Sequence, residues 1–200
     1  MQRVSIEFPF LSIPGANPNT LFRLAPIQAI TATNPVALAG SAAYGTRVLS
    51  AVFDPPCDAY ASLEGAPLTI FDARKPARAA IAGDTLFTSA FATVGGGTEG
   101  GDVGPYPLTF FQRVVQQPLF ADPSKGCDRQ LRRFDTVVTK KPFLPVLVKG
   151  VVWASAEIFQ GDVGGEADEE GYKGRRWHGA WGVRVDTAFV EWNKVDCDSL

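Results

Sequence analysis

The sequence is poor in the side chains on which most catalytic and metal sites depend. It contains one histidine, His178, so a Ser-His-Asp or Cys-His arrangement would have to use that residue as its base. A zinc site built on a histidine pair is excluded, and the G-x-S-x-G sequence that carries the serine nucleophile of many hydrolases is absent. These absences predict a non-enzymatic protein with no cofactor and no bound metal.

Cysteine is also scarce. The three cysteines, Cys57, Cys127 and Cys197, are an odd number at wide spacing, which fits neither a disulfide framework nor the paired C-x-x-C of a zinc site. We therefore expect reduced thiols, and a bridge between Cys57 and Cys127 is the alternative.

Neither an excess of charge nor a long hydrophobic run is present. The 19 Lys and Arg residues nearly balance the 21 Asp and Glu residues, giving a net charge of -2, so nucleic acid is not expected as the main partner. No run approaches the roughly 18 apolar residues of a membrane helix. Arg3, Glu7 and Pro9 interrupt the first apolar segment, so we expect no Sec signal, no membrane insertion, and a cytoplasmic or virion location.

Long stretches without glycine or proline are missing as well. The 20 glycines and 15 prolines leave only residues 127–141 and 183–200 with more than eleven consecutive residues free of both. A helix of ordinary length is expected only in these two stretches. A short helix over residues 128–133, with Asp128 as its N-cap, is predicted in the first.

Strand signals fill the sequence between these breakers. In residues 3–10, apolar side chains alternate with Arg3, Ser5 and Glu7, which is the period of a half-buried strand. Seven further runs are rich in Val, Ile, Thr or Phe and are bounded by turn residues: 27–33, 46–53, 68–71, 85–94, 108–115, 134–139 and 146–160. The pattern predicts an all-β fold in one domain over residues 1–200, either an antiparallel β-sandwich or a jelly-roll-like barrel.

The breakers are unevenly distributed. Prolines dominate the first part of the chain, so residues 1–45 are predicted to be a Pro-rich extended segment, either an arm that packs on a neighbouring subunit or an irregular surface segment. Residues 46–200 are predicted to form the β core. Glycines concentrate in two segments that we expect to be mobile loops, residues 95–105 and 161–174.

The clearest alternation covers residues 175–190. Trp177, Trp181 and Val183 share one parity, which we interpret as a core face. The other parity carries polar side chains and supplies the candidate binding residues: Arg176, His178, Arg184 and Asp186. This strand is expected to pair with residues 146–160 as an antiparallel hairpin, and the strand over residues 146–160 to be central in the sheet.

Two motif-like segments are interpreted as loops. Residues 95–100 match G-x-G-x-x-G, but residues 101–105 that follow cannot open the helix that would hold a pyrophosphate. The acidic residues 162–170 do not follow the ligand order of a calcium-binding EF-hand loop.

Three functions are compatible with these patterns. The first is a non-enzymatic structural or interaction protein whose partners are protein subunits in a homo- or hetero-oligomer, such as a virion or phage coat, tail or accessory component. The second is a carbohydrate-binding type of β-sandwich that uses Trp or Tyr side chains. The third is a hydrolase that relies on carboxylates alone.

Overall fold

The computed structural model describes residues 2–56, 68–77, 84–94, 104–134, 145–159, 174–185 and 187–200. These residues form ten strands, three α-helices and two short 3-10 helices. The strands are β1 (Arg3–Leu11), β2 (Phe22–Thr31), β3 (Arg47–Asp54), β4 (Leu68–Arg74), β5 (Thr85–Thr93), β6 (Leu119–Phe120), β7 (Cys127–Arg133), β8 (Val146–Ser155), β9 (Gly174–Arg184) and β10 (Ala188–Val195). The helices are α1 (Pro35–Ala43), α2 (Leu108–Gln116), α3 (Ala156–Phe159), η1 (Pro123–Lys125) and η2 (Cys197–Ser199).

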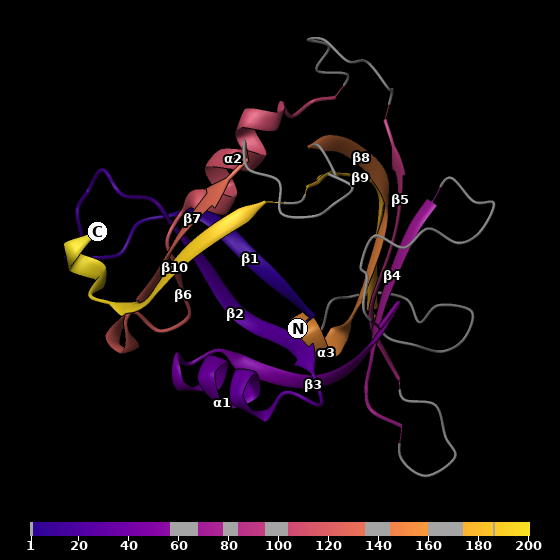
Figure 1. The fold of residues 1–200 in the computed structure, drawn as a ribbon, viewed down its shortest axis with the longest axis horizontal. Coiled ribbons are helices and arrows are strands. Elements are labelled where there is room, and N and C mark those ends of the chain that lie inside the picture. The colour runs from indigo at the N-terminus through magenta and orange to yellow at the C-terminus, as the bar shows by residue number, and fades with distance from the viewer. Residues whose placement is uncertain are drawn as a thin grey trace.

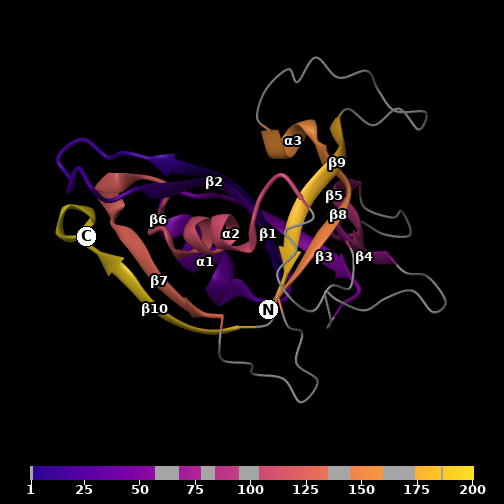
Figure 2. The ribbon, with the colours of Figure 1, turned by 90° about the horizontal axis from the view of Figure 1, so that it is seen from above.

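The sheet branches at β2. Residues 27–31 of β2 pair in parallel with β3, Arg23 and Leu24 pair in parallel with β6, and β1 pairs with β2 antiparallel. Beyond β3, the order continues through β4, β5, β8 and β9. We call these four strands the long wing. The strands β6, β7 and β10 form the short wing. Figures 1 and 2 show the two wings at opposite ends of the molecule, with β2 running between them.

The all-β prediction is confirmed, because strands in one large sheet dominate the described residues. The sheet is mixed and open, so the prediction that it is purely antiparallel is wrong, and the sandwich or jelly-roll is not confirmed. The parallel pairing of β2 with β3 depends on α1, which connects them, since parallel neighbours need a crossover segment.

The first 45 residues contribute β1, β2 and α1 to the fold instead of forming an extended arm. Two of the prolines in this segment occupy positions that need no ladder donor. Pro9 lies in β1, an edge strand, and Pro35 begins α1, where a missing N–H costs nothing. Asn34 caps α1, its side chain accepting a hydrogen bond from the Ala37 N–H at 3.0 Å.

Two segments have the opposite secondary structure from that predicted. Residues 108–115 were expected to be a strand but form most of α2, whose amphipathic period was hidden by its many Phe and Val residues. Residues 128–133 were expected to be a helix but lie in β7, which pairs with residues 188–195 of β10. α2 contacts both β7 and β9 and so bridges the two wings.

Several strand predictions are confirmed. β1 lies where the alternation predicts it, and β3, β4 and β5 lie where the β-branched and aromatic runs predict them. β8 pairs antiparallel with β9 and with β5, which makes it a central strand. α3 replaces the predicted end of the β8 strand. The predicted strand over residues 134–139 and the predicted mobile loops at 95–105 and 161–174 lie almost entirely outside the described residues.

Among the residues that the structure describes, two clusters form the hydrophobic core. The larger joins β2, β3 and the long wing, and it is rich in alanine: Ile27, Ala29, Ala51, Phe53, Ala73, Leu86, Ala154 and Ile158. Trp177 packs against this cluster, as its parity predicted. The smaller cluster lies near the C-terminus and contains Ile13, Phe22, Cys127 and Cys197.

A disulfide crosses the smaller cluster. Cys127 at the start of β7 is bonded to Cys197 in η2, 70 residues later, so the prediction of reduced thiols is wrong for these two. The alternative bridge between Cys57 and Cys127 is excluded because Cys127 is already paired. Spacing along the sequence gave no sign of this pairing, because the β7–β10 ladder is what brings the C-terminus beside Cys127.

Candidate functional site

The structure does not gather the predicted binding residues at one place. Arg176 and His178 are exposed on one face of β9. Arg184 lies on the opposite face, where its Nη1 is 3.4 Å from the Thr69 hydroxyl and its side chain lines a cavity of about 340 Å³. Asp186 lies outside the described residues.

A β-bulge at Gly179 is the reason for this separation. His178 is opposite Val151 on β8 and Ala180 is opposite Gly150, so β9 holds one extra residue at this point. Gly179 has φ 68°, the left-handed region that glycine tolerates best. The bulge reverses the parity of every later side chain, which moves Arg184 to the face that carries Trp177.

A buried polar network lies between β1, β2 and the short wing. Arg23 of β2 is 3% exposed, and its Nη1 donates to a Glu7 carboxylate oxygen of β1 at 2.5 Å. The same guanidinium donates to the backbone oxygens of Gln117 and Val115, at 3.2 and 3.3 Å. Burial lowers the pKa of Arg23, and Glu7 opposes that shift by charge and hydrogen bonding.

The network continues into β7 and β10. Gln130 of β7 is buried, accepts from Arg132 at 3.0 Å and donates to the Glu191 carboxylate of β10. Burial also lowers the pKa of Arg132, and the positive charge of Arg23 adds to that shift. Polar side chains thus hold β1, β2, β7 and β10 in register where a core would normally be apolar.

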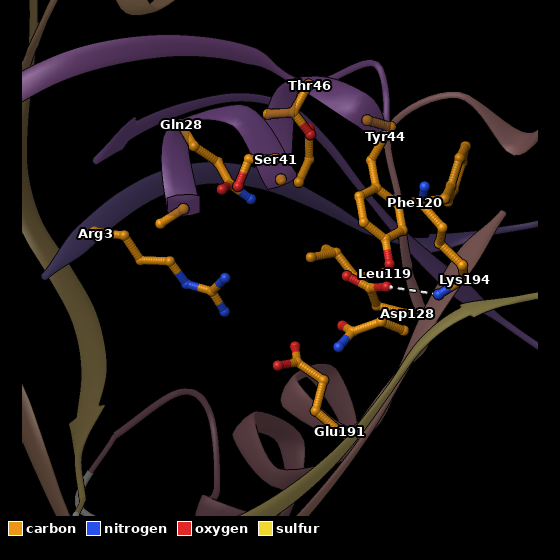
Figure 3. A pocket seen from close by; sticks show the side chains of 15 residues that line it. Arg3, Gln28, Ser41, Tyr44, Thr46, Leu119, Phe120, Asp128, Glu191 and Lys194 are labelled. Atoms are coloured by element: carbon orange, nitrogen blue, oxygen red, sulfur yellow. Dashed lines mark hydrogen bonds between the residues drawn. The ribbon is translucent and has the colours of Figure 1, made fainter. Parts of the chain in front are cut away.

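A polar pocket of about 380 Å³ opens beside this network (Figure 3). Its walls come from α1, β1, β2, β6, β7 and β10, so it exists only where the short wing meets the branch point. Fifteen residues line it, and those that carry its chemistry are Arg3, Gln28, Tyr44, Asp128, Glu191 and Lys194.

Tyr44 and Asp128 face each other across one side of this pocket (Figure 3). Burial raises the pKa of the Tyr44 phenol, and the nearby Asp128 adds to that shift. Burial likewise raises the pKa of the Asp128 carboxyl above its ordinary value of 3.8. Asp128 accepts the backbone N–H of Lys194 at 3.3 Å, and the Lys194 ammonium lies 5.7 Å from the centre of the Tyr44 ring.

Three strands have only one paired neighbour among the described residues: β1, β9 and β10. β1 is protected against pairing with another chain by Pro9, by two register shifts and by Phe10, whose φ is 64°. β9 is protected by the bulge at Gly179 and by exposed Arg175 and Arg176. Such features are common protections of an edge strand against further strand pairing.

β10 lacks these protections over residues 188–192. This segment pairs with β7 without a register shift, and the shift comes only beyond Trp192. Phe189 on one face is 55% exposed and Val190 on the other is 40% exposed. Arginines of β7 hold two of its aromatic rings in place: Arg129 lies 5.3 Å from the Trp192 ring centre, and Arg132 lies 5.5 Å from the Phe189 ring centre.

Comparisons with family models, with curated proteins and with solved structures found no match to this chain. In the part of the chain that the structure describes, no helix is long and apolar enough to cross a membrane. Within those same residues, no group of three or more His, Cys, Asp or Glu side chains is placed to hold a metal ion.

Sequence reasoning missed both the pocket and the β10 edge. The pocket residues are scattered from Arg3 to Lys194, and only the branched sheet brings them together. The alternation over residues 175–190 predicts a single strand, whereas the structure ends β9 at Arg184 and begins β10 at Ala188.

Proposed function

We propose that this protein is a non-enzymatic structural subunit of a larger assembly, and that β10 is the strand through which it pairs with a second copy of the chain. The observation that carries the proposal is the contrast among the three edge strands. β1 and β9 carry prolines, bulges or charges, whereas residues 188–192 of β10 expose backbone and apolar side chains on both faces.

A second copy suits this edge because the segment presents no exposed charge to itself. The one charged side chain among residues 188–192 is Glu191, which is half-buried and accepts a hydrogen bond from Gln130. Two β10 strands related by a twofold axis would therefore meet without like-charge repulsion. Leu131, opposite Val190 on β7, widens the apolar surface beside the edge.

The disulfide is compatible with a virion as the setting for this assembly. Disulfides persist in oxidising surroundings, which include virion surfaces, and are rare in the reducing cytosol. The bond between Cys127 and Cys197 ties the base of the β7–β10 ladder, so the proposed pairing edge and the disulfide belong to the same wing. A coat, tail or accessory component of a virion or phage remains the kind of subunit we propose.

Light scattering coupled to size exclusion tests the proposal, with the purified chain measured over a wide concentration range. The wild-type chain is expected to form a dimer or higher oligomer, and Val190→Lys is expected to shift it to monomer because a charge on an edge strand opposes pairing. Val52→Lys is the matched control, since Val52 is 53% exposed but lies in β3, which is paired on both sides. A monomeric wild-type chain, or a Val190→Lys variant that associates like Val52→Lys, would overturn the proposal.

The other two functions predicted from the sequence have less support. Trp177 packs on the core and the Trp181 ring lies against Gly104, so neither offers the open aromatic platform on which a carbohydrate-binding module would rely. Asp128 and Glu191 share a pocket, which is the feature that a carboxylate hydrolase would need. Both functions stay predictions.

A further inference from the structure

The polar pocket between α1 and the short wing contains a buried group that lacks the hydrogen-bond partner such groups normally have. Gln28 is 4% exposed, yet its Oε1 has no hydrogen-bond partner. The Tyr44 hydroxyl is also buried, and it lies beside the Asp128 carboxylate, which interacts with it. Both residues line the pocket, and Figure 3 shows their polar ends directed into it. Buried polar atoms are nearly always paired, so an unpaired one facing a cavity points to a ligand.

Two carboxylates supply further hydrogen-bond acceptors in the pocket, beside Gln28 Oε1. Asp128 and Glu191 come from the paired strands β7 and β10, and both face the same space. Neither forms a salt bridge within the described residues; Asp128 accepts one N–H from Lys194, and Glu191 accepts one from Gln130. Each carboxylate therefore keeps acceptor capacity that the protein does not use.

Neither positive group of the pocket forms a salt bridge with these carboxylates among the described residues, although the charge of Arg3 acts on Asp128. The Lys194 ammonium lies over the Tyr44 ring, and the Arg3 side chain comes from β1 on the side of the pocket opposite Asp128 (Figure 3). The arrangement places acceptors from β2, β7 and β10 around one space.

We propose that this pocket binds a primary ammonium group, carried either by a free amine or by a lysine side chain of a partner protein. An ammonium has three donors and no acceptor, which matches Gln28 Oε1 and the carboxylates of Asp128 and Glu191. The apolar wall formed by Ala25, Ala37 and Leu119 suits the alkyl stem that carries the group. A volume of about 380 Å³ leaves room for that stem.

Calorimetric titration of the full chain with n-butylammonium tests this site, with n-butanol and butyrate as the neutral and anionic probes of the same size. Butylammonium is expected to bind and the other two are not. Asp128→Asn and Glu191→Gln are each expected to weaken binding about ten- to a hundredfold, the range for losing a charge-assisted hydrogen bond. Asp198→Asn is the matched control, because Asp198 is exposed in η2 and does not line the pocket.

The Gln28→Met variant tests the same site independently, in case a carboxylate variant folds poorly. Methionine removes the unpartnered oxygen without leaving a cavity, so the variant is expected to fold at least as stably as the wild type and yet bind butylammonium more weakly. A capped tripeptide with a central lysine distinguishes the two sources: tighter binding of the peptide assigns the site to a protein partner, and tighter binding of butylammonium assigns it to a free amine.

Three results would overturn the assignment: no binding of either amine, equal binding of butyrate or butanol, or unchanged affinity in both carboxylate variants. Glu191 belongs both to the pocket and to the proposed pairing segment, but Val190 does not line the pocket, so the same titration of the Val190→Lys variant separates amine binding from strand pairing. The failure of this proposal is therefore distinguishable from the failure of the proposed pairing at β10.

Discussion

At the scale of the residue, the molecule is distinguished by charged and polar groups placed where apolar ones would be expected. Arg23 is the clearest case, since a nearly fully buried guanidinium is stabilised by Glu7, by two backbone oxygens and by the Gln130 side chain. A buried ion pair adds little net stability compared with an apolar pair of similar size, but removing one partner leaves the other charge uncompensated. These residues therefore fix how β1 and β2 sit against the short wing.

Asp128 provides a prediction at this scale. Burial raises the pKa of its carboxyl above 3.8, so the folded chain holds that proton more tightly than the unfolded chain, and ionisation at neutral pH costs stability. Asp128→Asn is expected to raise the free energy of unfolding at pH 7 by about 1 kcal/mol or less. Urea denaturation over a pH series measures this difference, which should shrink as the pH falls toward 3.8. A variant that is less stable than the wild type at pH 7 would contradict it.

At the scale of the element, local patterns predicted what depends on local contacts. The alternation in residues 3–10 identified β1, and the apolar runs identified β3, β4, β5 and β8. These strands could be predicted because the apolar residues that they bury are visible in their own local sequence. The β8–β9 pairing was predicted for the same reason. The bulge at Gly179 escaped the prediction, since a single glycine in a strand does not reveal which way the register shifts.

The helices and the short wing were missed because their structure depends on distant partners. The Leu, Phe and Val residues of α2 fit a strand as well as a helix in the sequence alone. The contact of α2 with β7, which favours the helix, is visible only in the structure. The segment of β7 offers Asp128 as a helix N-cap in a stretch free of glycine and proline, and only its ladder with β10 makes it a strand. The pocket draws residues from both ends of the chain, so no window of the sequence contains it.

At the scale of the whole molecule, the disulfide closes the chain onto itself. It joins Cys127 to Cys197 across 70 residues, and a loop of that length is expected to contribute about 4 kcal/mol through the entropy of the unfolded chain. Reduction is expected to lower the free energy of unfolding by about that amount, as measured by urea denaturation with and without dithiothreitol. Cys57→Ser is the control and should respond to reduction like the wild type. Equal unfolding midpoints with and without reductant would contradict the expectation.

The sheet as a whole is open, and this openness is what allows another chain to extend it. Its branched plan leaves three edges in the described part of the chain, and β10 is the one that is apolar and unprotected. An open sheet of this kind can be extended by another chain, whereas a closed barrel cannot. In the proposed pairing, the apolar side chains that the core does not bury, among them Phe189, Val190 and Trp192, would become part of the interface.

Residue-resolved amide hydrogen exchange of residues 188–192 tests this claim most directly. In a lone chain, the N–H groups of β10 that point away from β7 face solvent and exchange rapidly, whereas strand pairing with a second copy protects them. We predict slow exchange of these outward amides at high protein concentration, and fast exchange on dilution or in Val190→Lys. Fast exchange of the outward amides at every concentration, with the inward amides protected as usual, would contradict the account.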